Sequence, residues 1–412
     1  MKQLAVWLFD HRVGTLTQDK SGRMSFTYAD GVREALSLSM PLREQPYEHD
    51  LCESFFGGLL PESAQARQLI GRCFGVSGNN SFSLLGVIGH ECAGAISLFP
   101  DGIEPPAVSQ SAAVVLSESA LAEHIRELPR RPLLAGIEDI RLSLAGAGDK
   151  AAVSLIDGNI ALPSSGAVTS HILKTNISTI GETVSNEFFC MKLAERMGFA
   201  VAEVELRVAE DIEFLLVRRY DRDYDQNGIP VRLHQEDFCQ ALGVISANKY
   251  ESEGGPGYKD CFELLRRVSR PAVDRNRFVE YTILNFLIGN MDAHSKNFSL
   301  LHGANLSLAP LYDVLSTRIY PQLSPRLAMR VDKYYEPDKI LPRHWQRLCE
   351  NCGLSYPAFK RTFTDFCDEI AGSAEDLRDE LRRVGHQQTY TSIVEQIEKS
   401  AKFVGKRFRE GA

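Results

Sequence analysis

The chain has little of what marks a membrane, repeat or nucleic-acid-coating protein. No apolar run reaches the roughly 18 residues that a membrane-spanning helix needs, which argues against insertion into a bilayer. Acidic residues outnumber basic ones by 54 to 46, so no global basic field recruits nucleic acid, although a local basic patch is still open. The sequence shows no internal repeat and no low-complexity tract. A globular protein remains as the expected class.

Cysteine shows no pairing pattern. The nine cysteines are an odd number, and most lie in apolar helical contexts, which favours reduced, buried thiols and a cytoplasmic location. The spacing Cys349-x-x-Cys352, with His344 nearby, suggests half of a zinc site. Because no second cysteine pair lies close by, packed thiols are the preferred interpretation. Residues 1–10 become charged too soon for a signal peptide and are predicted to form a first strand.

The length allows several subdomains. A chain of 412 residues can bury a large core and is expected to hold two or three of them. Residues 101–112 contain glycine, proline and serine, which are typical of turns and loops, and they are the best candidate for a linker. We therefore predict an N-terminal subdomain over 1–108, a β-rich part over 109–222 and a mostly helical part over 223–412.

Hydrophobic periodicity places the main elements. Leu4, Val6 and Leu8 alternate with other residues, and residues 3–28 are predicted to form two or three short strands, while residues 64–74 predict a helix. The apolar, glycine- and alanine-rich segment 86–98 is predicted to be buried strand with tight turns. Residues 186–197 predict a helix that ends before Gly198.

The strongest chemical signal follows an apolar helix over 278–288. A polar loop comes next and contains Asp292, Lys296 and Asn297, and Asp313 follows fifteen residues or so later. The layout is similar to that of protein kinases, in which an aspartate base, an asparagine five residues on and a second aspartate act together. Asp292 would then be the general base, Lys296 would neutralise the γ-phosphate, and Asn297 and Asp313 would hold Mg²⁺. The alternative is a helix end followed by an ordinary polar turn.

A small-residue loop lies between two apolar segments in the β-rich part. It consists of Ser143, Leu144, Ala145, Gly146, Ala147, Gly148, Asp149 and Lys150. Short side chains let successive backbone amides approach phosphate oxygens, so the loop could cradle a phosphate. Its spacing matches neither a Walker A motif nor a complete G-x-G-x-x-G, and an ordinary β-turn is the alternative. Ser143 is either a phosphate acceptor or a strand-end hydroxyl.

A lysine ends the next apolar strand. Lys174 closes the segment 171–174, and a strand lysine can pair with the α- and β-phosphates when a carboxylate holds it. Glu187, on the predicted helix that follows, is the candidate partner. Each could instead be a solvated surface charge. The polar, glycine-rich segment 249–257 is interpreted as a surface turn.

In this order, the segments resemble the HipA-type serine/threonine kinase toxins of bacterial toxin–antitoxin modules. The resemblance runs nearly from end to end and is carried by residues 55–61, 143–150, 171–174, 186–198, 220–222, 235–240, 249–257, 292–299 and 312–313. It implies an α+β, bilobal protein-kinase-like fold. A β-rich N-lobe, a helical C-lobe and an additional N-terminal subdomain are expected.

The resemblance also implies ATP and Mg²⁺ as cofactors. It makes Asp292 catalytic, and it makes Asn297 and Asp313 metal ligands. Together with the reasoning above, the expected ATP-binding residues are Ala145, Gly146, Ala147, Gly148, Asp149, Lys150, Lys174, Glu187, Arg218, Tyr220, His294, Asn297 and Tyr312. Ser143 would be autophosphorylated, which in the family ejects the phosphate loop and inactivates the kinase.

The family's partners supply further expectations. Its targets are aminoacyl-tRNA synthetases, chiefly glutamyl-tRNA synthetase, and phosphorylation stalls translation and leads to growth arrest and persistence. A small helix-turn-helix antitoxin, HipB, holds the toxin, so contact with DNA would be indirect. Two alternatives stay open. One is a nucleotide-binding pseudokinase or co-repressor that works through a DNA-bound partner, and the other is a kinase of a small molecule such as a sugar or aminoglycoside.

Three positions depart from the family's pattern. The loop reads Gly148-Asp149-Lys150 where Gln-Glu-Lys is frequent, so we expect activity with altered loop mobility. Arg218 stands where an acidic residue is common, so main-chain contacts to adenine are expected without a carboxylate contact. Residues 331–337 lack a lysine cluster that touches DNA in a member of the family, so direct contact between this chain and DNA is not expected.

Overall fold

Two compact units make up the protein. The computed structural model describes residues 2–106, 113–137, 140–146, 148–163, 167–226 and 230–410. The first unit comprises Met1–Thr175, Arg207–Ala247 and Leu300–Ala304. The second unit comprises Asn176–Leu206, Asn248–Ser299 and Asn305–Ala412.

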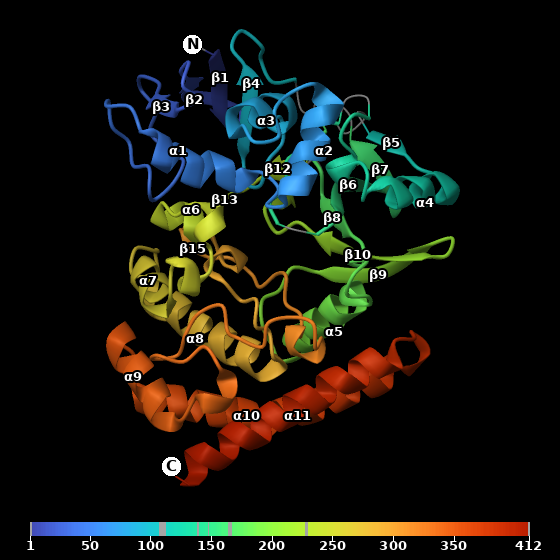
Figure 1. Cartoon of the computed structure of the whole chain (residues 1–412), viewed down its shortest axis with the longest axis vertical. Helices are drawn as coiled ribbons and strands as arrows, with labels where there is room; N and C mark the ends of the chain where they lie inside the picture. Colours follow the sequence, from blue (N-terminus) through green and yellow to red (C-terminus); the bar gives the residue numbers. More distant parts are fainter. Residues whose placement is uncertain are drawn as a thin grey trace. The chain divides into compact units, whose positions relative to one another are not determined.

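The first unit begins with a four-stranded antiparallel sheet in the order β3-β2-β1-β4 (Figure 1). Its strands are β1 (Lys2–Leu8), β2 (His11–Gln18), β3 (Met24–Tyr28) and β4 (Ile96–Pro100). Leu4, Val6 and Leu8 are buried because alternate residues of a strand point to one face, here the core. The strands predicted over 3–28 are confirmed.

Three helices accompany this sheet in the chain, α1 (His49–Phe56), α2 (Ala64–Phe74) and α3 (Ser81–Ile88). The helix predicted over 64–74 is confirmed, but the prediction of strand over 86–98 is wrong in its first part. Residues up to Ile88 complete α3, and β4 starts only at Ile96. The side chain of Asn80 accepts a hydrogen bond from the Ser83 amide at 2.9 Å, which starts this helix.

A second sheet follows in the order β5-β7-β6-β8-β10-β9. Its strands are β5 (Ala113–Val115), β6 (Lys150–Ile156), β7 (Asn159–Pro163), β8 (His171–Lys174), β9 (Val204–Ala209) and β10 (Ile212–Arg218). The smaller elements of this unit are α4 (Glu118–Glu127), β11 (Arg222–Tyr224), β12 (Pro230–Arg232), β13 (His234–Asp237) and α6 (Phe238–Leu242). Strands therefore predominate in the first unit.

The second unit is mostly helical. Its helices are α5 (Thr183–Arg196), α7 (Tyr258–Leu264), α8 (Pro271–Ile288), α9 (Pro342–Cys352), α10 (Tyr356–Glu380) and α11 (Gln387–Glu410). Two short strands follow α8 in the chain: β14 (Ser299–His302), most of which belongs to the first unit, and β15 (Ser307–Leu308) of the second unit. The predicted helix over 186–197 is confirmed, although it starts earlier, at Thr183. The long helices α10 and α11 lie side by side (Figure 1).

An aromatic cluster forms the core between α8, α9, α10 and α11. Phe363 of α10 contacts the rings of Phe286, Trp345, Phe359 and Phe408 at centroid distances of 5.2–5.9 Å, mostly edge to face. Such edge-to-face pairs add to the stabilisation that burial of the rings provides. The cluster joins α8 to the three consecutive C-terminal helices α9, α10 and α11.

Strands and helices together confirm the predicted α+β class. Among the described residues, no helix is both long and apolar enough to cross a membrane. The division into three subdomains stays a prediction, and its first boundary, at residue 108, falls within 107–112, which lie outside the described residues.

Replacing Phe363 by alanine should destabilise the second unit strongly. Phe363 is fully buried, so the substitution leaves a cavity and should lower the free energy of unfolding by about 3–5 kcal/mol. The chain has two tryptophans, so in a Trp7→Phe background the fluorescence of Trp345 reports urea unfolding of this core. Val384→Ala, at a 45 % exposed position, serves as the control and should change stability by less than about 0.5 kcal/mol. Equal effects of both substitutions would contradict the packing described.

Candidate active site

The loop that carries Asp292 emerges from a buried helix end. Residues 281–290 are all buried, and α8 ends at Gly289, whose φ of 77° lies in the left-handed region. A Cβ at this position would lie 2.9 Å from the Cβ of Arg318. Both the backbone conformation and the space therefore favour glycine here. The position at which the chain leaves the helix is fixed as a result.

Hydrogen bonds hold the first residues of this loop. The Met291 amide donates to Thr317 Oγ1 at 2.7 Å, and the Thr317 hydroxyl donates to the Gly289 carbonyl at 3.3 Å. The Asp292 amide donates to Asn290 Oδ1 at 3.1 Å. The backbone that precedes Asp292 is therefore held by two side chains, that of Asn290 in the same loop and that of Thr317 later in the chain.

The rest of the loop closes back on Asp292. The His294 amide donates to the Asp292 carbonyl at 2.7 Å, and Asn297 Nδ2 donates to the same carbonyl at 3.0 Å. The Asp292 side chain itself is 45 % exposed, while His294 Nε2, almost fully buried, lies 4.0 Å from Asp292 Oδ2. The loop thus presents a carboxylate to solvent from a fixed backbone, and it ends in a short 3₁₀ turn over Ser295–Asn297.

The segment with Tyr312 and Asp313 packs against this loop. The Tyr312 hydroxyl donates to the Lys296 carbonyl at 3.0 Å and is hydrogen-bonded to Ser299 Oγ at 2.7 Å. Asp313 follows with φ 58°, a left-handed conformation that is uncommon for residues other than glycine, although aspartate and asparagine adopt it more readily than most. The structure therefore brings the Tyr312-Asp313 dipeptide next to the loop that holds Asn297.

Helix α5 anchors the same segment from the other side. The side chain of Asn186 accepts from the Ser316 amide at 2.8 Å and donates to the Ser316 carbonyl at 3.0 Å. Glu187 is the next residue of α5 and is buried. It belongs to the second unit and Lys174 to the first, so their pairing stays a prediction. Lys296, predicted to assist catalysis, is buried within the loop.

The predicted phosphate loop lies in the first unit. Gly146 has φ 102° and forms a parallel bridge with Pro61. The ammonium group of Lys150 donates a hydrogen bond to the Ala145 carbonyl, and a Cβ on Gly146 would collide with that group. The Lys150 side chain therefore lies against Gly146, in space that a larger residue at this position would occupy. Ala147, also predicted here, lies outside the described residues, and Gly148 is exposed.

Two lysines face each other beside this loop. Lys150 on β6 is the direct antiparallel partner of Lys174 on β8. Side chains that are directly opposite on neighbouring strands point to the same face of the sheet. Like charges in this arrangement repel, and a bound anion would offset that repulsion. The next loop residue, Asp149, has a pKa raised by burial, and its carbonyl accepts from the Thr175 amide at 3.2 Å.

Ser143 is fully buried in this structure. Its hydroxyl donates to the Leu59 carbonyl at 2.7 Å, and its amide donates to the Glu91 carbonyl at 2.9 Å. The hydroxyl is therefore enclosed by protein and already committed to a carbonyl oxygen.

The predicted adenine contacts, Arg218 and Tyr220, flank a buried ionic cluster. Arg218 is exposed at the end of β10, and the Tyr220 hydroxyl donates to Gln235 Oε1. Between them, Arg219 binds Asp221 through two hydrogen bonds of 3.0 and 2.9 Å. We call Glu91, Arg219, Asp221 and Arg222 the hinge cluster.

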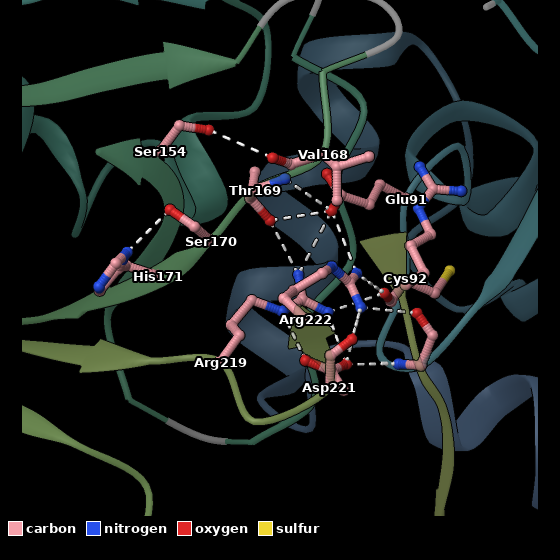
Figure 2. A network of polar contacts seen from close by, with 12 residues as sticks. Glu91, Cys92, Ser154, Val168, Thr169, Ser170, His171, Arg219, Asp221 and Arg222 are labelled. Atoms are coloured by element: carbon pink, nitrogen blue, oxygen red, sulfur yellow. Dashed lines mark hydrogen bonds and ion pairs between the residues drawn. The ribbon is translucent and has the colours of Figure 1, made fainter. Parts of the chain in front are cut away.

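The hinge cluster ties distant segments of the first unit together (Figure 2). Arg222 Nη2 donates to Glu91 Oε1 at 3.1 Å, and Arg219 Nη1 donates to Thr169 Oγ1 at 2.9 Å. All four charged side chains are almost completely buried. Burial by itself raises the pKa of Asp221, but the Arg219 and Arg222 guanidiniums outweigh it and hold that pKa far below its usual range. Glu91 shifts in the same direction, since the arginines again outweigh burial and lower its pKa.

Sequence reasoning missed three contributors to these sites. Tyr250, from the segment interpreted as a surface turn, donates its hydroxyl to Asp292 Oδ1 at 2.6 Å. Thr317 holds the backbone of the loop with Asp292, and Glu91 belongs to the hinge cluster. None of them stands at a recognisable spacing from the residues it supports, so no signal in the sequence identifies them.

Profiles of two domain families match the chain. The HipA-like C-terminal domain matches residues 142–375, and the HipA N-terminal domain matches residues 4–99. The chain belongs to the HipA family of kinases.

Relatives extend over most of the chain. A putative kinase of Sinorhizobium fredii is 44% identical over 94% of this chain and 96% of its own length. The serine/threonine-protein kinase toxin HipA of Shewanella oneidensis is 29% identical over 73% of this chain and 71% of its own. The fold matches the HipA structure from the Shewanella oneidensis MR-1 complex of HipA, HipB and operator DNA, with a TM-score of 0.87 and 24% identity, covering 99% of this chain and 98% of that one. The predicted HipA-type, kinase-like α+β fold is confirmed.

The cysteine pair of α9 does not have the character of a metal site. His344 Nδ1 accepts a hydrogen bond from the Leu341 amide at 3.0 Å and so caps the helix. Burial raises the pKa of Cys349 and that of Cys352 to about 12, which opposes the thiolate that zinc requires. Among the described residues, no group of three or more histidine, cysteine, aspartate or glutamate side chains could hold a metal ion.

Removing the charge of Asp221 should destabilise this HipA-family chain. Asp221→Asn leaves the buried Arg219 and Arg222 short of a countercharge, and breaking such a pair costs about 3–5 kcal/mol. The expected result is a much lower melting temperature in calorimetry. Asp211→Asn is a matched control, because its ion pair with Arg126 lies at the surface and contributes at most about 1 kcal/mol. Similar melting temperatures for both variants would show that the hinge cluster is not stabilising.

The same aspartate should add a pH dependence. Because the folded state lowers the pKa of Asp221, its contribution to stability is complete above the unfolded-state pKa of about 3.9 and is lost as the pH falls towards the folded-state value. Between about pH 5 and about pH 2, the wild type should therefore lose more stability than Asp221→Asn. The change in the midpoint of urea unfolding measures this loss. A parallel decline of the two proteins would contradict the assignment.

Proposed function

We propose that this chain is an ATP-dependent protein serine/threonine kinase that acts as the toxin of a HipBA-like toxin–antitoxin system. The observation that carries the proposal is the catalytic loop, which holds Asp292 on a fixed backbone beside Asn297 and the Tyr312-Asp313 dipeptide. The relative from Shewanella oneidensis is named a serine/threonine-protein kinase toxin, which supports the same assignment.

The donor set suits Mg²⁺. Asn297 uses its amide nitrogen to bind the Asp292 carbonyl, so its amide oxygen is the atom that would serve as a ligand. Asp313 would add a carboxylate oxygen, and magnesium prefers hard oxygen ligands of these two kinds. When bound, Mg²⁺ would neutralise charge on the β- and γ-phosphates. These two residues fit that role without any nitrogen or sulfur ligand.

The chain's own residues would position the reactants. Asp292 would orient the acceptor hydroxyl and take its proton, while Lys296 would counter charge on the γ-phosphate. Lys150 and Lys174, opposite each other on β6 and β8, would attract the phosphates of ATP. The remaining proposed ATP-binding residues are Ala145, Gly146, Ala147, Gly148, Asp149, Glu187, Arg218, Tyr220, His294, Asn297 and Tyr312.

We further propose that Ser143 is autophosphorylated and that this inactivates the kinase. A phosphoserine carries a charge of about −1.5 to −2. Ser143 is fully buried with its hydroxyl against the Leu59 carbonyl, so that charge would meet a carbonyl oxygen in an enclosed position. The phosphorylated segment would have to leave this position, and the adjoining phosphate loop would move with it.

The proposed partners follow from the relatives. A HipB-like helix-turn-helix antitoxin would bind this chain, since the Shewanella oneidensis structure is a complex of HipA, HipB and operator DNA. Because residues 331–337 lack the lysine cluster noted above, DNA would be reached only through the antitoxin. The proposed target is an aminoacyl-tRNA synthetase, with glutamyl-tRNA synthetase as the leading choice. A cytoplasmic location would suit such a target. The alternative, a pseudokinase or co-repressor, is tested by the first experiment below.

Incubation with Mg-ATP should add one phosphate to Ser143 in the wild type and none in Asp292→Asn. Loss of a general base lowers the rate by about 10²–10⁴-fold. Intact mass and peptide mapping, starting from unphosphorylated protein, measure the outcome. Asp338→Asn, which alters an exposed carboxylate of the same unit, is the control and should behave like the wild type. Tight Mg-ATP binding without transfer to any protein would favour the pseudokinase.

A further inference from the structure

Tyr250 reaches the catalytic carboxylate from a different part of the second unit. It lies just before the 3₁₀ turn Glu251–Glu253, and its hydroxyl donates to Asp292 Oδ1 at 2.6 Å. Its ring also meets the ring of His294 edge to face, with the centroids 5.2 Å apart. The side chain therefore contacts two residues of the catalytic loop at once.

A second bond joins the same two segments. Ser295 Oγ donates to the Lys249 carbonyl at 3.3 Å. The Lys249 ammonium lies 5.2 Å from the centre of the Tyr250 ring, within reach of a cation–π interaction. The segment 249–257 is thus docked on the catalytic loop and is not the free surface turn that its polar, glycine-rich composition suggests.

The backbone around Tyr250 is closely constrained. The Tyr250 carbonyl accepts from the amides of Glu253 and Gly255 at 3.0 and 2.9 Å. A Cβ on Gly255 would lie 1.9 Å from the Asn248 carbonyl oxygen, so the turn closes only with glycine at this position. The turn therefore fixes the backbone from which the Tyr250 side chain extends to Asp292.

Glu251 fixes the turn to the rest of the unit. Its carboxylate accepts from the Arg330 amide at 2.7 Å and pairs with Arg330 Nε at 2.9 Å, while its own amide donates to the Ala328 carbonyl at 3.2 Å. A Cβ on Gly257 would lie 2.6 Å from this carboxylate. The turn that carries Tyr250 is therefore held to the segment 328–330 by hydrogen bonds and an ion pair of Glu251.

We propose that Tyr250 is a positioning residue for Asp292, an inference that rests on the kinase function proposed above. A carboxylate has about four acceptor positions on two oxygens, so a bond from Tyr250 to Oδ1 leaves capacity for the acceptor hydroxyl. The tyrosine holds the carboxylate in one rotamer before the substrate arrives. When the acceptor oxygen bonds to the γ-phosphorus, its proton passes to Asp292, the bond from that phosphorus to the β-γ bridging oxygen breaks, and ADP leaves.

Tyr250→Phe tests the hydroxyl alone, because the ring and its contact with His294 remain. The rate constant of self-phosphorylation at saturating Mg-ATP should fall about 10- to 100-fold, as expected for the loss of a hydrogen bond to a charged group. The ATP concentration for half-maximal rate should stay within about twofold of the wild-type value. The melting temperature should stay within about 2 °C of that of the wild type. A merely structural role would change these two quantities as well.

Tyr281→Phe is the matched control. The Tyr281 hydroxyl belongs to the same unit and donates to the Ala309 carbonyl at 3.3 Å, and it accepts from Arg277 at 3.0 Å. Its loss should lower the melting temperature and leave the rate constant within about twofold. A comparable loss of rate in both variants would overturn the positioning role, because it would trace the effect to general loosening.

Two failures can be told apart. If the wild type itself transfers no phosphate from Mg-ATP, the proposed kinase function is overturned and the role of Tyr250 with it. If the wild type is active and Tyr250→Phe matches it in rate, the kinase function stands and only the positioning role is overturned. A selective loss of rate in Tyr250→Phe supports both.

Discussion

The buried end of α8 is the constraint on which the loop with Asp292, the proposed catalytic loop, depends. Ten consecutive residues, 281–290, are buried in close-packed surroundings. The helix can therefore end here only at a residue that adopts the left-handed conformation in the space available. Gly289 supplies that residue, and Arg318 occupies the space that a side chain would need. Because the exit point is fixed, Asn290, Thr317 and Asn297 can bind the backbone on either side of Asp292. The carboxylate is thereby presented from a rigid frame.

Charge is handled differently in the two units. In the first unit, the hinge cluster buries two arginines with two carboxylates, an arrangement that is stable only when every partner is present. In the second unit, the Asp292 carboxylate, which we propose to be catalytic, stays about half exposed and accepts a hydrogen bond from the Tyr250 hydroxyl. The buried cluster stabilises the backbone between Arg218 and Tyr220, whereas the exposed carboxylate keeps acceptor capacity for chemistry.

Much of the fold could be predicted from local pattern. Alternation at the start of residues 3–28 predicted strands, and the helical pattern predicted α2 and α5, because these periods follow directly from backbone geometry. A continuous apolar run over 278–288 predicted the end of α8. The first part of the segment 86–98 was predicted wrongly as strand, since residues 86–88 complete α3. A short, uniformly apolar run fits a buried strand and a buried helix equally well, and here the Asn80 cap decided for helix.

The sequence by itself predicted the family, because many short segments occur in the family's order. It also placed Asp292, Lys296 and Asn297, which we propose as site residues, within one short loop. Tertiary structure decided what supports them. Tyr250 reaches Asp292 across 42 positions, and Arg222 reaches Glu91 across 131. Hydrogen bonds and ion pairs act over a few ångströms of space and carry no fixed separation along the chain, so only the folded backbone brings such partners together.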